Sequence, residues 1–143
     1  MSLRTNLGPA VLLVAAGCVH GGTYSRLPPC APPPPASASP VDAHIYDSTS
    51  VTVRPKRIGG KPVHYPEDLK RARISGEAIV EVVIDARGYP EPGSVVVIGA
   101  TYSAFGAAAA RAITESCYSP GLRDGQPVRV RLAVPIKFWV TAS

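Results

Sequence analysis

The segment that decides the fold is residues 128–140, which read VRVRLAVPIKFWV. Every second residue from Val128 to Val140 is apolar, and successive side chains of a β-strand point to opposite faces. The intervening positions carry basic, small or aromatic side chains, namely Arg129, Arg131, Ala133, Pro135, Lys137 and Trp139. This pattern predicts one long strand with a buried face and a basic, partly aromatic face.

Pro135 adds a constraint to this strand. Proline has no backbone N–H to donate, so it is confined to edge strands, strand starts and bulges. We therefore predict an edge strand, which can accept an extended peptide through main-chain hydrogen bonds. The alternative is an ordinary solvated face whose arginines and lysine are balanced by the carboxylates of Glu77, Glu81 and Asp85.

Two helices are predicted upstream of this strand. Residues 65–72 form the first, because Pro66 suits an initial turn and the acidic residues that follow complement a helix N-terminus. Residues 104–115 form the second, with Ser103 as its N-cap and apolar residues at helical spacing. Between them, residues 77–85 alternate with a period of two and residues 94–99 are rich in valine, which predicts a hairpin.

The N-terminus has the pattern of an export signal. A polar start with Arg4 precedes an apolar run over residues 9–16, which is far shorter than the roughly 20 residues that span a bilayer. Residues 14–18, VAAGC, resemble the lipobox of bacterial lipoproteins, in which the cysteine is acylated and becomes the new N-terminus. We expect lipidation at Cys18, with ordinary signal cleavage as the alternative.

Residues 18–54 are predicted to be a disordered linker. They are rich in proline, alanine and serine and hold few large apolar residues, so they cannot build a core. The expected organisation of the 143 residues is a signal peptide over 1–17, a lipid-anchored linker over 18–54 and one domain over 55–143. Cys30 and Cys117 remain after cleavage, and the sequence leaves open whether they form a disulfide or stay as two thiols.

No catalytic pattern is present. The three histidines, His20, His44 and His64, do not have metal-ligand spacing, and no nucleophile is matched to any of them. The net charge of +5 alone does not indicate nucleic-acid binding, because no binding motif accompanies it and the chain is expected to be exported. We therefore expect no enzyme activity, no cofactor and no metal.

Several residues in order resemble the C-terminal domain of TonB, the periplasmic energy transducer of Gram-negative bacteria. They are Tyr65-Pro66, Gly76 before a strand ending in Ile84-Asp85, Gly88, Phe105 with Ala109 and Ala112, Tyr118 with Pro120, Gly125 with Pro127-Val128, and Pro135-Ile136 with Phe138. The resemblance implies an α+β fold with a three-stranded antiparallel sheet and two helices. It also implies recognition of a TonB-box peptide from an outer-membrane receptor by strand addition.

Carried over to this chain, the resemblance gives a set of candidate peptide-binding residues. They are Tyr65, Pro66, Arg129, Val130, Arg131, Leu132, Ala133, Pro135 and Lys137. A typical TonB also has an uncleaved transmembrane helix and a long proline-rich span, whereas here a lipid anchor and a short linker are expected. The resulting hypothesis is a passive, lipid-anchored binding module linked to TonB-type transport.

The expected partner is an envelope protein, with a TonB-dependent outer-membrane receptor as the candidate. The alternative is a structural component of an envelope complex that uses the same edge strand for subunit pairing, including a homodimer. We expect the domain to face the periplasm. Val19 after Cys18 favours the outer membrane over the inner one, because aspartate at that position is associated with inner-membrane retention.

Overall fold

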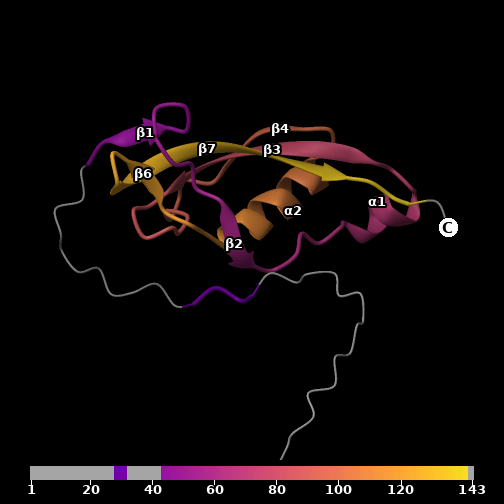
Figure 1. The fold of residues 1–143 in the computed structure, drawn as a ribbon. Helices are drawn as coiled ribbons and strands as arrows, with labels where there is room; N and C mark the ends of the chain where they lie inside the picture. Colours follow the sequence, from indigo (N-terminus) through magenta and orange to yellow (C-terminus); the bar gives the residue numbers. More distant parts are fainter. Residues whose placement is uncertain (1–27, 32–42, 142–143) are drawn as a thin grey trace, which may run out of the picture.

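The computed structural model describes residues 28–31 and 43–141, so Cys18, the expected signal peptide and most of the expected linker lie outside the described residues. The described part is a mixed α+β fold (Figure 1). Its elements, in chain order, are β1 (Ile45–Asp47), β2 (Arg57–Gly60), α1 (Glu67–Arg71), β3 (Gly76–Ile84), β4 (Val96–Ala100), α2 (Ser103–Thr114), β5 (Ser116–Tyr118), β6 (Gly121–Arg123) and β7 (Gln126–Phe138).

The centre of the sheet is the antiparallel pair of β3 and β7, in register from Gly76 opposite Phe138 to Ile84 opposite Val130. The main sheet has the order β1-β7-β3-β4, and β6 also pairs with β7. β2 and β5 form a separate two-stranded sheet. The expectation of three strands is therefore wrong, because the short strands β1 and β6 add to the β7, β3 and β4 that the sequence pattern predicted.

The predicted helices and hairpin are confirmed, with one correction. Ser103 is the first residue of α2 and not its N-cap; Tyr102 is the N-cap, in extended conformation and without a side-chain capping bond. The helix begins there because the backbone N–H groups of Phe105 and Gly106 both donate to the Tyr102 carbonyl, at 3.0 and 3.3 Å. Ser103 therefore lies one position too late to cap the helix.

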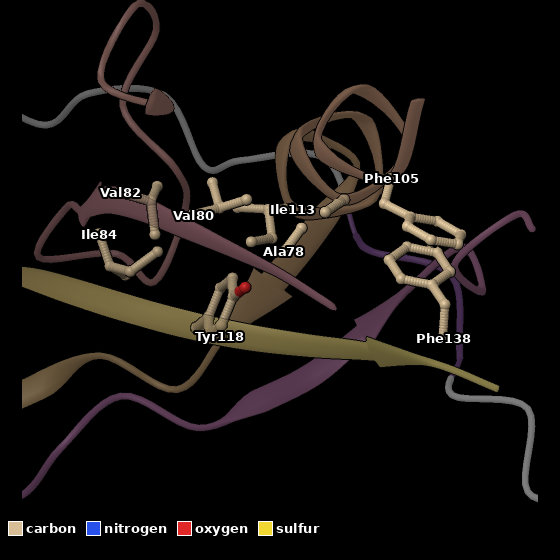
Figure 2. Close-up of a cluster of buried hydrophobic side chains, with 9 residues drawn as sticks. Ala78, Val80, Val82, Ile84, Phe105, Ile113, Tyr118 and Phe138 are labelled. Carbon is tan, nitrogen blue, oxygen red and sulfur yellow. The ribbon is translucent and has the colours of Figure 1, made fainter. Parts of the chain in front are cut away.

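Helix α2 covers one face of the sheet (Figure 1). Ala78, Val80, Val82 and Ile84 of β3 are fully buried. They form one apolar cluster with Ile113 of α2 and Tyr118 of β5, and Figure 2 shows these side chains. Gly106 permits close packing, since a Cβ there would lie 2.9 Å from a methyl carbon of Val97 on β4. Among the described residues no helix is long and apolar enough to span a bilayer.

An aromatic cluster closes one end of this core. Phe105 of α2 stacks on Phe138 of β7 with ring centroids 4.4 Å apart, as Figure 2 shows. Tyr65 packs edge-on against both rings at 5.6 Å, and its hydroxyl donates to the Ile74 carbonyl at 2.5 Å. The cluster thus joins the segment before α1 to the end of β7.

Two parts of the expected linker belong to the fold. β1 pairs in parallel with β7, and the Thr52 and Val53 N–H groups donate to the Leu122 carbonyl at 2.8 and 3.0 Å. Further upstream, residues 28–31 lie against the small β2–β5 sheet. There Cys30 forms a disulfide with Cys117, with Cα atoms 5.7 Å apart, and the Gly60 N–H donates to the Pro28 carbonyl at 3.0 Å. The sequence left open whether Cys30 and Cys117 are bonded, and in the structure they form a disulfide.

Replacing Phe105 with alanine is expected to lower the free energy of unfolding by about 3–5 kcal/mol, because the fully buried ring would leave a cavity beside Phe138. Trp139→Ala is the matched control, since that aromatic side chain is 68% exposed, and it should cost less than about 1 kcal/mol. Urea unfolding followed by circular dichroism measures both. Equal losses would contradict the central place of Phe105 in the core.

Candidate functional site

The two edges of β7 have different neighbours. The direction of the backbone N–H and C=O groups alternates from residue to residue, which shows which groups face each edge. The Thr101 N–H donates to the Glu77 carbonyl at 2.9 Å, and the Glu91 N–H donates to the Val83 carbonyl at 2.8 Å. Odd-numbered residues of β3 thus direct their backbone groups towards β4 and the loop that leads to it. Because these directions alternate along a strand, the even-numbered residues of β3 face β7.

The same alternation orients β7. The register partners of Ala78, Val80, Val82 and Ile84 are Ile136, Val134, Leu132 and Val130, so these β7 residues direct their backbone groups towards β3. Val128 shares this direction and pairs with β6, which therefore continues the edge beyond the end of β3. The backbone groups of Arg129, Arg131, Ala133, Pro135 and Lys137 consequently point to the opposite edge, which we call the outer edge.

β1 covers only the beginning of the outer edge. Its three residues lie opposite Arg129, Val130 and Arg131, and no other described strand pairs along this edge. Residues 132–138 therefore form what we call the open edge. β7 is an edge strand over this part alone, which corrects the expectation that the whole strand lies at an edge. The missed strand β1 has only three residues and no apolar periodicity.

Pro135 lies in the open edge in the orientation that proline requires. Its nitrogen points away from β3, so the absence of an N–H removes no hydrogen bond from the central pair. Its carbonyl still faces the open edge. The N–H and C=O groups of Ala133 and Lys137 face the same way, and together these groups can accept an added strand.

The two sides of the open edge differ in exposure. On the side of α2, Leu132, Val134 and Ile136 are half-buried and pack against the core together with Val63 and Tyr65. On the other side, Ala133, Pro135 and Lys137 are exposed. A strand added here would rest alternate side chains on an apolar surface and on an exposed one that carries Lys137.

Most of the predicted basic face is paired within the chain. Arg129 donates to both carboxylate oxygens of Glu91, at 2.5 and 2.8 Å, and to the Ala43 carbonyl at 2.7 Å. The hydrogen bond to Glu91 raises the pKa of Arg129 above its ordinary value. Arg131 lies 3.7 Å from the Glu81 carboxylate. The balancing carboxylates expected from the sequence thus include Glu81, whereas Glu91, in the loop before β4, was missed.

The other candidate residues are divided between two places. Tyr65 lies beside the open edge through its contact with Phe138, while Val130 is fully buried and lies opposite Tyr46 of β1. Pro66 is the N-cap of α1 and lines a shallow groove beside α2 that also contains Lys61 and Arg111. Those two cations both pair with Glu115, at 3.3 and 3.8 Å. Pro66 therefore lines the groove, Tyr65 lies against the end of β7, and the other candidates belong to β7 itself.

The open edge offers backbone hydrogen bonds and apolar contacts, which suit binding. In the described part of the chain, no group of three histidine, cysteine, aspartate or glutamate side chains could hold a metal ion. Of the two histidines in this part of the chain, His64 lies 4.0 Å from Glu67 and His44 packs edge-on against Tyr46.

Comparison with known proteins gives one family. The family described as "Gram-negative bacterial TonB protein C-terminal" matches residues 61–140, from just after β2 to two residues beyond β7. It is a family of non-enzymatic protein-interaction domains. No curated protein matches the chain.

The pairing of Arg129 predicts different roles for the two arginines. Arg129→Ala is expected to lower the free energy of unfolding by about 1.5–3 kcal/mol, because it removes charge-assisted hydrogen bonds to a largely buried carboxylate. Arg131→Ala, at a side chain 47% exposed, should cost less than about 1 kcal/mol. Chemical denaturation compares them, and a larger loss for Arg131→Ala would show that the Arg129–Glu91 pair does not hold the fold.

Proposed function

The chain belongs to the TonB C-terminal family, and we propose that it is a periplasm-facing binding module that recognises a peptide segment of another envelope protein by strand addition at the open edge. Domains of this family bind envelope proteins. The proposal adds the mode of binding and its place on this chain.

The observation that carries the proposal is the set of outward main-chain groups on Ala133, Pro135 and Lys137. Unpaired backbone groups along a strand edge form a template for another strand, and each hydrogen bond formed there contributes about 0.5–1.5 kcal/mol. The apolar surface of Val134 and Ile136 would add the burial of alternate peptide side chains. Affinity then comes from the backbone and selectivity from the side chains.

The two faces of the open edge define the partner's chemistry. Side chains directed towards α2 would meet apolar residues, and those on the opposite face would lie near Lys137 and Arg131. An extended segment that alternates apolar with acidic or polar residues fits this surface. The candidate source is the TonB-box segment of a TonB-dependent outer-membrane receptor, which links the module to TonB-type transport.

We further propose that Cys18 is lipidated and holds the module on a membrane, with the outer membrane favoured. The support is the sequence VAAGC at residues 14–18, directly after the apolar run. Cys18 precedes residues 28–31 and the domain in the sequence, so the proposed anchor is attached on the N-terminal side of the binding module.

Ala133→Pro tests the binding mode. It removes an outward N–H from the open edge without touching the bonds to β3, and we expect a loss of affinity for synthetic TonB-box peptides of at least about tenfold, measured by fluorescence anisotropy. Ala133→Val is the matched control, because valine keeps the N–H and suits a strand.

Full retention of binding by Ala133→Pro would refute strand addition at this edge. If the wild-type chain binds no receptor peptide and instead self-associates as its concentration rises, the result favours subunit pairing through the open edge. Size-exclusion chromatography with light scattering, run on the same samples, detects that alternative.

Cys18→Ser tests the anchor. We expect the wild-type chain in the membrane fraction of the producing bacterium and the variant in the soluble periplasmic fraction, because one acylated cysteine supplies the membrane affinity. Cys30→Ser is the control, since it removes another cysteine and should leave fractionation unchanged. Equal fractionation of wild type and Cys18→Ser would exclude lipidation as the means of attachment.

A further inference from the structure

β1 occupies the same outer edge that the proposed peptide would use. Arg129 and Arg131 direct their backbone groups to the side that Ala133 and Lys137 face, and β1 lies along the first two. In this parallel register Tyr46 lies opposite Val130, between the two arginines, so its N–H and C=O groups are placed to pair with theirs. β1 and an added peptide would therefore share one continuous surface.

β1 is a short strand at the margin of the main sheet. It has three residues, and none of their side chains is buried. The guanidinium of Arg123 lies 4.7 Å from the centre of the Tyr46 ring, and Arg129 donates to the Ala43 carbonyl at 2.7 Å. Segments with few buried apolar contacts open at low free-energy cost. β1 can thus detach at a lower cost than a strand with a buried face, such as β3.

β1 also resembles, in its chemistry, the ligand expected for the open edge. Tyr46 shares the face of Val130, towards the apolar side, and Asp47 shares the face of its register partner Arg131. An aromatic residue next to an acidic one is thus already accommodated on this edge. Because β1 is covalently attached, it meets the edge at a high effective concentration.

We propose that β1 is an internal ligand of the outer edge, and that an external peptide which pairs along the whole edge from Arg129 to Lys137 binds by displacing it. This inference rests on the proposed strand addition. A short peptide that pairs only with Ala133–Lys137 binds beside β1 and does not compete with it. Partner length therefore decides whether β1 opposes binding.

The test uses the full chain and a fluorescent synthetic peptide with the sequence of residues 43–50, AHIYDSTS. Tyr46→Pro removes the central N–H of β1 and frees the beginning of the outer edge. We expect this variant to bind the peptide at least about tenfold more tightly than the wild-type chain does. Tyr46→Phe is the matched control, because it keeps both the N–H and the ring beneath Arg123, and it should behave as the wild type.

Hydrogen exchange supplies a second readout. The Arg131 amide should exchange faster in Tyr46→Pro than in the wild type, and saturating peptide should restore its protection. Equal peptide affinities for Tyr46→Pro and wild type, or absence of binding to both, would overturn the inference. Unchanged protection of the Phe105 and Val80 amides shows that the variant keeps its core.

Receptor peptides separate this inference from the proposed function. If TonB-box peptides that span the whole edge bind wild type and Tyr46→Pro equally, the result supports strand addition and contradicts competition by β1. If no receptor peptide binds either chain while AHIYDSTS binds Tyr46→Pro more tightly than wild type, the result contradicts the proposed partner. It still supports β1 as an internal ligand.

Discussion

The antiparallel pairing of β3 with β7 is the constraint on which the rest of the structure depends. Its register places Val80 and Ile84 in the buried core and turns the backbone of Ala133 and Lys137 outward. A slip of one residue would reverse both the buried face and the edge directions, and Pro135 would then interrupt the ladder. The proline and the alternation of apolar residues therefore specify the same register.

Much of this arrangement could be predicted from the sequence, because the signals are local. The alternation over residues 128–138 and 77–84 and the apolar stripe of α2 each follow from side-chain periodicity. The contribution of β1 could not be predicted. Its three residues join β7 across more than eighty positions of sequence, mainly through backbone groups that every residue possesses.

The candidate site was predicted only in part, because its limits depend on the long-range pairing of β1 with β7. Pro135 indicates an edge, but only the register shows that the edge opens after Arg131. The charge pattern was a weaker guide, since it cannot tell a free arginine from one that Glu91 holds. With Arg129 committed to the fold, the open edge offers main-chain groups and apolar side chains more than charge, which suits recognition of extended segments of varied sequence.

The disulfide between Cys30 and Cys117 also determines how the domain responds to mechanical load. Because Cys30 is bonded to Cys117, tension on the chain upstream of Cys30 would pass through the sulfur atoms into β5, next to the C-terminal end of α2. β1 lies within the covalent loop that this disulfide closes between Cys30 and Cys117. β1 is therefore shielded from pulling on the N-terminal segment, and its release depends on competition for the edge of β7 rather than on force.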